Sequence, residues 1–312
     1  MIKSTKFKVS VVVPAYNEQD NVSVLADELH RILCQYDDYE IIIVNDGSKD
    51  NTLDVLKKLH HENNRLHYIS LSRNFGHQYA LKAGLDMASG DCVISMDADM
   101  QHPPRLIPQM IEEWQTGFDI VYTVRHDSGT EGVFKRLTSR LFYKFFDALT
   151  GLKLPTGVAD FRLLDRKVVD VLKNMSEKAL FLRGIVFWMG YRQRAIDYQV
   201  QPRHAGHSSY SLKKMLGLAL AGATSFSVKP LRLAIYLGFL TAALGCLFTA
   251  YVLYMKLFGG SVITGWASIM CVLLILGGTQ LVIMGIIGEY IGRIFIEMKN
   301  RPSYIVDETS LK

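Results

Sequence analysis

Residues 92–104, CVISMDADMQHPP, indicate the fold of this chain more clearly than any other stretch. The apolar run at 92–96 is typical of a strand buried within a sheet, and the carboxylates of Asp97 and Asp99 follow it directly. Two carboxylates spaced in this way can bind one hard divalent cation, and such oxygen ligands suit Mg²⁺ or Mn²⁺. Pro103 and Pro104 then favour the start of a helix. An Asp-x-Asp pair also occurs in solvated turns, but its position after a strand favours a metal-diphosphate site.

Short β-rich runs alternate with helical patterns through residues 8–125. This order predicts an α/β fold in which a mainly parallel sheet has helices on both faces. The motifs G-x-G-x-x-G and G-x-x-x-x-G-K-[ST] are absent, which argues against a usual dinucleotide-binding domain and against a P-loop. The expected strands are Val9–Val13, Glu40–Val44, His67–Leu71, Cys92–Met96 and Asp119–Val124, with helices near 18–35, 51–61, 76–88 and 104–116.

Polar segments follow each of the first four expected strands, at 14–18, 45–52, 72–77 and 97–102. In open α/β sheets ligands collect at the carboxyl ends of the strands, so we expect these segments to share one edge. Asp46 ends its strand and is a better ligand candidate than Asp50, for which helix capping is expected together with Thr52. A carboxylate at Asp46 can accept hydrogen bonds from a nucleobase N–H or a ribose hydroxyl.

Two uncharged stretches, residues 233–255 and 267–288, contribute much of the 49% hydrophobic content. Each exceeds the roughly 20 apolar residues that cross a bilayer as a helix, although a pair of buried core helices is the alternative. Lys and Arg gather outside these stretches rather than in the link 256–266, so the positive-inside rule places both termini and the α/β domain in the cytoplasm. We expect an α/β domain at 1–202, a juxtamembrane amphipathic segment at 203–232, a transmembrane hairpin at 233–292 and a cytoplasmic tail at 293–312.

Composition excludes some partners and leaves others open. The net charge of +5 comes without a basic stripe interleaved with aromatic residues, which argues against a nucleic-acid partner. Four cysteines without paired spacing suit a reducing compartment. Glycines in and after the second apolar stretch permit close helix packing, and a homo-oligomer is one possibility that they leave open. The short tail after Pro302 could dock on a neighbouring molecule, and the sequence does not decide this.

A basic amphipathic pattern sets residues 126–165 apart from the α/β pattern before them. Lys135, Arg136 and Arg140 recur among apolar residues at helical spacing, with the two arginines one turn apart. One interpretation is a phosphate-binding face beside lipid, because arginine makes paired hydrogen bonds to phosphate. The other is a surface helix whose charges are only solvated.

Five segments of this sequence, in order, resemble glycosyltransferase family 2, and specifically the polyisoprenyl-phosphate glycosyltransferases. That group includes the dolichyl-phosphate mannose synthases and the bacterial undecaprenyl-phosphate glucosyltransferases. The resemblance covers nearly the whole chain, since two C-terminal spans match the bacterial integral-membrane branch, while the Q-x-x-R-W motif of processive polysaccharide synthases is absent. It implies a GT-A fold. The matching segments are VVVPAYNE at 11–18, VNDGSKDNT at 44–52, SRNFGH at 72–77, DADMQHPP at 97–104 and DFRLLDR at 160–166.

The resemblance also implies roles for individual residues. Asp99, Asp160 and Arg140 are the implied catalytic residues, with Asp160 a candidate general base whose alternative role is an ion pair with Arg162. The chain departs from many relatives at Gly157, where they carry Asp, and at Ser209, where a Lys is expected to close over the diphosphate. The implied nucleotide-sugar ligands are Pro14, Tyr16, Glu18, Asp46, Asp97 and Arg125; the metal ligands, for Mg²⁺ or Mn²⁺, are Asp97, Asp99 and Gln101; and the acceptor-phosphate ligands are Lys135, Arg136 and Arg140.

The implied reaction is inverting transfer of a hexose, with glucose expected, from a UDP-sugar to a polyprenyl phosphate such as undecaprenyl phosphate. The product would form on the cytoplasmic leaflet of the cell membrane. Transfer of another sugar, such as mannose or an aminoarabinose derivative, stays open because the sequence does not reveal the sugar pocket. A non-catalytic scaffold for a flippase is a further alternative, against which the intact Asp46, Asp97 and Asp99 argue. A lipid-flipping transporter is disfavoured, since two spans offer little path.

Overall fold

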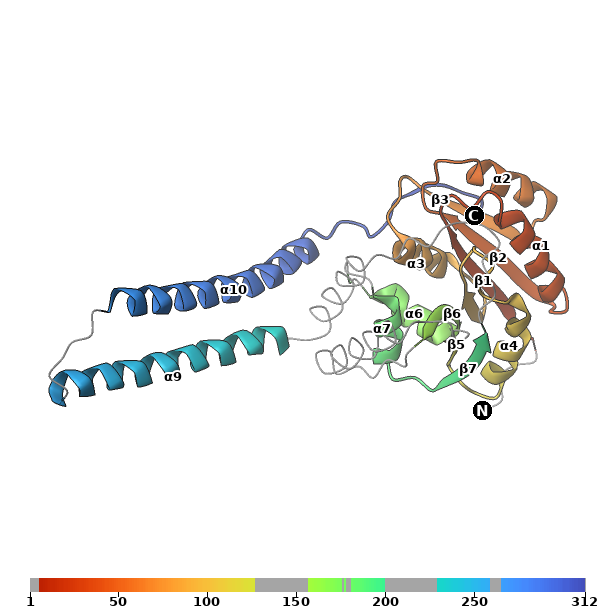
Figure 1. Cartoon of the computed structure of the whole chain (residues 1–312). Coiled ribbons are helices and arrows are strands. Elements are labelled where there is room, and N and C mark those ends of the chain that lie inside the picture. Colours follow the sequence, from red (N-terminus) through yellow and green to blue (C-terminus); the bar gives the residue numbers. More distant parts are fainter. Residues whose placement is uncertain are drawn as a thin grey trace. The chain divides into compact units, whose positions relative to one another are not determined.

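The computed structural model describes residues 6–126, 157–175, 177, 181–199, 229–258 and 265–311. The chain divides into two compact units. The first unit contains the described residues up to 199 together with 301–311, and the second contains 229–258 and 265–300 (Figure 1). The last residues of the chain therefore belong to the same unit as the first ones.

A mixed sheet of eight strands forms the centre of the first unit, in the order β7-β5-β6-β4-β1-β2-β3-β8. Neighbouring strands are parallel except at β6, which is antiparallel to both β4 and β5, and at β8, which is antiparallel to β3. The prediction of a mainly parallel sheet is thus confirmed, with two antiparallel strands that it did not include. The strands are β1 Lys8–Ala15, β2 Asp38–Asn45, β3 Leu66–Leu71, β4 Cys92–Ser95, β5 Ile120–His126, β6 Val158–Asp165, β7 Gln193–Gln199 and β8 Val306–Thr309.

Helices cover both faces of this sheet because alternate strand residues are apolar on both sides. Val11 and Val13 of β1 belong to the core that includes Leu29 of α1. The intervening Val12 faces α3, where Gly84 lets the helix backbone approach so closely that an added Cβ would collide with Val12. The helices of this unit are α1 Val22–Leu33, α2 Thr52–Glu62, α3 His77–Met87, the 3₁₀ turn η1 Pro104–Leu106, α4 Ile107–Gln115, α6 Arg166–Asn174 and α7 Leu182–Trp188.

A buried carboxylate, Glu40, ties β1 and β2 to the segment before β4. Glu40 is 4% exposed. Its Oε1 accepts hydrogen bonds from Ser10 Oγ at 2.6 Å and from the backbone N–H of Ser89 at 2.7 Å, and Lys8 Nζ lies 2.8 Å from its Oε2. Burial opposes ionisation of Glu40, but the hydrogen bonds from Lys8, Ser10 and Ser89 outweigh it and lower the pKa below its ordinary value of 4.5.

Replacing Glu40 with glutamine should lower the free energy of unfolding at pH 7 by about 1–3 kcal/mol, because an amide replaces an ionised acceptor. Since the pKa is lower in the folded state, the stabilisation is complete above the ordinary value of 4.5 and is lost as the pH falls through the folded-state pKa. Denaturant unfolding of wild type and Glu40→Gln between pH 7 and pH 3 should show the two converging. The exposed Glu62→Gln is the control, and a pH-independent difference would contradict this account.

Two long helices, α9 Lys229–Phe258 and α10 Trp266–Met298, make up the described part of the second unit (Figure 1). They contact each other, but many of their large apolar side chains stay exposed. Both stretches predicted to span a membrane, 233–255 and 267–288, fall within these helices. Among the described residues, one segment, Ala234–Met255 of α9, is long and apolar enough by length and composition to cross a membrane. The membrane-spanning role of α10 therefore stays a prediction. α10 also continues past residue 292, where the hairpin was expected to end.

Candidate functional site

The loops that follow β1 and β2 are joined to each other at the carboxyl edge of the sheet. The backbone N–H of Asn17 donates to Ser48 Oγ at 2.9 Å, and Asn17 Oδ1 accepts from the backbone N–H of Lys49 at 2.8 Å. Asp50 Oδ1 accepts from both the backbone N–H and the hydroxyl of Thr52, at the start of α2. Asp50 and Thr52 therefore form a turn at the start of α2, which confirms one part of the capping interpretation, whereas the N-cap residue itself is Asn51, which makes no side-chain capping bond.

Asp46 fastens the loop that follows β3. Its side chain is buried, and its two carboxylate oxygens accept hydrogen bonds from the backbone N–H groups of Phe75 at 2.8 Å and Gly76 at 2.9 Å. Burial raises the pKa of Asp46, although these two hydrogen bonds oppose the rise. Gly47, with φ +63°, lets the loop after β3 approach the chain after β2 closely, because a Cβ at Gly47 would collide with the backbone of Arg73. Asp46 thus sets the path of the chain into α3, and its role as a nucleotide ligand stays a prediction.

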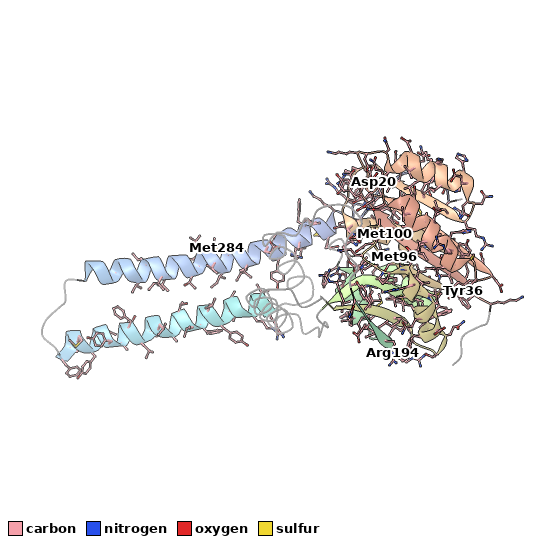
Figure 2. All side chains as sticks on the ribbon, turned by 45° about the vertical axis from the view of Figure 1, so that its right-hand side comes forward. Asp20, Tyr36, Met96, Met100, Arg194 and Met284 are labelled. Atoms are coloured by element: carbon pink, nitrogen blue, oxygen red, sulfur yellow. The ribbon has the colours of Figure 1, made fainter. Side chains whose placement is uncertain are left out.

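Residues 97–102 form a tight turn that presents two carboxylates at the same edge. The backbone N–H of Asp97 donates to His102 Nδ1 at 3.0 Å, and the backbone N–H of Gln101 donates to Asp99 Oδ1 at 3.1 Å. Met100, which both bonds span, takes a left-handed conformation with φ +62°. Met96 and Met100, labelled in Figure 2, flank the carboxylate pair along the chain. The Asp-x-Asp pair therefore lies in a defined turn rather than in a solvated loop.

The environment of Asp97 fits a cation ligand. Its Oδ1 is buried and accepts no hydrogen bond from the described part of the chain, and His77 Nε2 lies 3.4 Å from it. A buried carboxylate oxygen is costly unless a positive group compensates it, and His77 is one such group, to which a bound cation would add a second. The described residues contain no cluster of three or more His, Cys, Asp or Glu side chains that would hold a metal alone. A cation at this pair would need further oxygen ligands, which substrate phosphates commonly supply.

Asp160 lies at the same edge because β6 runs antiparallel to β4, so that β6 begins where β4 ends. It is 3% exposed. Arg183 of α7 binds both of its oxygens, at 2.8 Å from Nε and 2.7 Å from Nη2, and Arg162 Nη2 lies 2.8 Å from its Oδ1. Burial opposes ionisation, but Arg183, His77 and Arg162 hold the pKa of Asp160 well below its ordinary range. The alternative role, an ion pair with Arg162, is confirmed, and a carboxylate paired so fully is a poor general base.

His77 connects the two carboxylate groups. His77 is the first residue of α3, and its side chain is 41% exposed. Its Nε2 lies 3.4 Å from Asp97 Oδ1 and 3.6 Å from Asp160 Oδ2. Burial alone would lower the pKa of His77, but Asp160 and Asp97 raise it above its ordinary value. Gln78 adds a longer hydrogen bond to Asp160 at 3.4 Å. Arg183 carries no sequence signal, and His77 stands out only as the end of the 72–77 segment.

The remaining predicted nucleotide-sugar residues are placed as follows. Pro14 is buried within β1, Tyr16 is 40% exposed after it, and Glu18 is half-buried. Arg125 is exposed near the end of β5, and its backbone N–H donates to the carbonyl of Gly157 at 2.8 Å. Gly157 has φ +82°, and a Cβ there would lie 2.7 Å from the Arg125 carbonyl oxygen, which explains why glycine stands at this position. The predicted acceptor-phosphate residues Lys135, Arg136 and Arg140 lie outside the described residues, as does Ser209.

Comparison with known proteins agrees with this architecture. Residues 10–172 match the glycosyl transferase family 2 model, and residues 229–294 match the GtrB C-terminal hairpin model. The glycosyltransferase YkcC of Bacillus subtilis is 45% identical over 98% of this chain and 95% of its own length. The SfII prophage-derived bactoprenol glucosyl transferase of Shigella flexneri is 41% identical over 97% of this chain and 98% of its own length. The bactoprenol glucosyl transferase of Shigella phage SfV is 41% identical over 98% of this chain and 100% of its own length. The chain therefore belongs to glycosyl transferase family 2, as a member that carries the GtrB C-terminal hairpin.

Proposed function

We propose that this protein transfers glucose from UDP-glucose to the phosphate of a polyprenyl lipid, undecaprenyl phosphate, with inversion at the anomeric carbon. One observation carries the proposal: relatives named bactoprenol glucosyl transferases are 41% identical over 97% or more of this chain, across both of its units. The carboxylate turn at the carboxyl edge of the sheet supports the same class of reaction. Transfer of another sugar, such as mannose, uses the same chemistry and is the alternative that the experiment below separates.

The reaction is a single displacement. An oxygen of the acceptor phosphate forms a bond to C1 of glucose, while the bond from C1 to the β-phosphate oxygen of UDP breaks and UDP leaves with the electron pair. A phosphate monoester has a second pKa near ~6, so the acceptor is close to doubly ionised at neutral pH and is already nucleophilic. A strong general base is therefore unnecessary, which agrees with the complete pairing of Asp160 by Arg162 and Arg183.

Asp97, Asp99 and Gln101 are the residues that would hold Mg²⁺ or Mn²⁺. The buried Oδ1 of Asp97, which accepts no hydrogen bond from the described residues, supports this assignment. A bound divalent cation supplies Lewis-acid neutralisation of the charge that develops on the UDP leaving group. His77 Nε2 lies 3.4 Å from Asp97 Oδ1 and His102 Nε2 lies 3.7 Å from Asp97 Oδ2, so two imidazoles flank this carboxylate before substrate binds.

The second unit would bring the enzyme to its acceptor. α9 contains a segment apolar enough to span a bilayer, and we infer that residues 267–288 of α10 form a second span. Large apolar side chains stay exposed along both helices, including Phe239 at 73%, Leu247 at 68% and Leu281 at 68%, as expected for lipid-facing surfaces. The charge pattern favours both termini in the cytoplasm. Sharing one membrane with the polyprenyl phosphate supplies proximity that a soluble enzyme would lack.

Arg140 is expected to bind the acceptor phosphate together with Lys135 and Arg136. Replacing Arg140 with alanine removes a charge-assisted hydrogen bond worth about 1.5–3 kcal/mol, so the KM for undecaprenyl phosphate should rise about tenfold to a hundredfold. The KM for UDP-glucose should stay within about twofold of wild type, because the donor contacts are unchanged. Steady-state kinetics of Arg140→Ala against Lys173→Ala, an exposed lysine on α6, measures both constants. An unchanged acceptor KM would assign Arg140 to the solvated surface.

The proposed function is tested by transfer of labelled glucose from UDP-glucose to undecaprenyl phosphate by the purified full-length protein in detergent. The assay is run with Mn²⁺, with Mg²⁺ and with EDTA, and with unlabelled UDP-galactose or GDP-mannose as competitors. Labelled lipid that forms only with metal, and that other nucleotide-sugars do not suppress, is the expected result. A protein that binds UDP and metal but labels no lipid would have a different sugar or acceptor, and one that binds neither would be a non-catalytic scaffold.

A further inference from the structure

The strand β8 follows the helices of the second unit along the chain and belongs to the sheet of the first unit. It pairs antiparallel with β3, with Ile69 opposite Thr309 and Ser70 opposite Glu308. The pairing extends beyond the strand, because the backbone N–H of Ser72 donates to the carbonyl of Ile305 at 3.0 Å. β3 would otherwise be an edge strand with unpaired backbone groups, so β8 covers an edge that open sheets must protect.

Side chains reinforce this pairing at two points. Glu308 accepts a hydrogen bond from the Tyr68 hydroxyl at 2.6 Å, and its other oxygen lies 2.7 Å from Lys57 Nζ of α2. Tyr304, just before β8, donates its hydroxyl to Asp86 Oδ2 at 2.9 Å. Asp86 lies in the last turn of α3, so the tail contacts α2, β3 and α3 together.

Both anchor points lie on segments that also contain residues of the candidate site. Ser72, bonded to Ile305, begins the loop in which the N–H groups of Phe75 and Gly76 bind Asp46. Asp86, bonded to Tyr304, lies in the last turn of the helix whose first residue is His77, the side chain between Asp97 and Asp160. The tail therefore holds the loop and the helix that position His77.

The tail is also short. Residues 299–303 alone connect the end of α10 at Met298 to Tyr304. A chain of this length reaches at most about 20 Å when fully extended, which limits the separation of Tyr304 from Met298 to that distance. Because β7 precedes α9 and β8 follows α10 in one sheet, a hairpin that crosses a bilayer twice has both ends on the side of that sheet.

We propose that β8 and Tyr304 form a tether that holds the candidate site at the membrane surface, with Tyr304 and Glu308 as positioning residues for the bilayer-embedded acceptor. This inference rests on the proposed function, since it assumes a lipid acceptor. The tether acts on the position of the sheet edge relative to the bilayer, and the tail itself contacts no substrate.

The test uses the full-length protein in liposomes of phosphatidylethanolamine and phosphatidylglycerol. The double variant Tyr304→Phe/Glu308→Ala removes the side-chain anchors and keeps the backbone pairing, whereas removal of the whole strand would expose the β3 edge. Asp307→Ala is the matched control, because Asp307 is an exposed carboxylate on the opposite face of the same strand. Tyr304→Phe/Glu308→Gln is the rescue variant, since glutamine still offers an oxygen to the Tyr68 hydroxyl.

Two acceptors separate positioning from folding: undecaprenyl phosphate in the bilayer, and citronellyl phosphate, which is short and soluble in water. In the double variant, the KM for undecaprenyl phosphate should rise about fivefold or more, while kcat and KM for citronellyl phosphate stay within about twofold. The rescue variant should lie between the double variant and wild type. Hydrogen exchange at the amides of residues 72–77 should be faster in the double variant and unchanged in Asp307→Ala.

Unchanged kinetics with the bilayer acceptor would overturn the tether, and so would an equal loss with both acceptors, which indicates a general folding defect. If wild type transferred glucose to neither acceptor, the proposed function would fail while the exchange measurement would still decide the anchoring. Faster exchange at 72–77 in the double variant would then support anchoring of the loop by the tail, and unchanged exchange would overturn it.

Discussion

Replacing Asp160 with alanine should lower the free energy of unfolding by about 3–5 kcal/mol, because it leaves a buried arginine without its counter-charge. Arg162 is 2% exposed and pairs with Asp160 at 2.8 Å, and Arg183 loses both of its bonds to the same carboxylate. Thermal or denaturant unfolding of the full-length protein in detergent measures the effect. The matched control is Asp170→Ala on α6, whose exposed pair with Arg166 at 3.8 Å is worth no more than about 1 kcal/mol.

The same variant separates two roles for Asp160. A positioning carboxylate predicts lost stability and, in Asp160→Asn, a partial recovery because the amide oxygen still accepts a bond from Arg183. A general base predicts the opposite, namely a normally stable Asp160→Asn protein with its kcat abolished. Stability of Asp160→Ala equal to that of the Asp170→Ala control would contradict the burial and pairing described for this residue.

Replacing Asp97 or Asp99 with asparagine should lower kcat by about a hundredfold or more, because loss of a charged metal ligand removes several kcal/mol of leaving-group stabilisation. Asparagine is chosen because its oxygen can still accept the hydrogen bond that Asp99 receives from the Gln101 N–H, so the turn is retained. Turnover with saturating UDP-glucose, together with Mn²⁺ binding followed by electron paramagnetic resonance, tests both the chemistry and its cause.

Asp20→Asn provides the control for this pair, since Asp20 is an exposed carboxylate in the loop before α1 and is labelled in Figure 2. It should retain wild-type turnover and Mn²⁺ binding. Full activity of both Asp97→Asn and Asp99→Asn would remove the Asp-x-Asp pair from the mechanism. Lost activity with unchanged Mn²⁺ binding would place the metal elsewhere.

The parallel half of the sheet was predictable from the sequence because each strand is a short apolar run. The expected strand Val9–Val13 appears as Lys8–Ala15, and Glu40–Val44 appears as Asp38–Asn45. Strands covered on both faces have this composition, and it marks them without knowledge of their neighbours. The differences lie at the ends, where hydrogen bonds to neighbouring strands extend each strand beyond its apolar run.

The antiparallel strands were not predictable in the same way. β8 has the sequence Val-Asp-Glu-Thr, which carries no apolar run, and it becomes a strand only because β3 offers an open edge. Propensity is a weak guide for such a segment, because tertiary pairing decides it. The sequence left open whether this tail docks on a neighbouring molecule, and in this structure it pairs within its own chain.

In the candidate site, too, some residues were predictable from the sequence and some contacts were not. Asp46, Asp97 and Asp99 were found because they follow buried strands, and strand ends meet at one edge of a parallel sheet. Asp160 was named only through the resemblance, and its contacts with His77 and Arg183 were not predicted, since they depend on the reversed direction of β6 and on the position of α7. Such contacts join residues far apart in the chain and leave no local pattern.

The central claim is a single displacement by a polyprenyl phosphate, and proton and phosphorus NMR of the purified lipid product tests it most directly. From UDP-glucose, which carries an α linkage, the account predicts glucose joined to the lipid through one phosphate in the β configuration. An α-linked product would contradict a single displacement. A diphosphate linkage, or glucose released only as the free sugar, would contradict attack by the acceptor phosphate on C1.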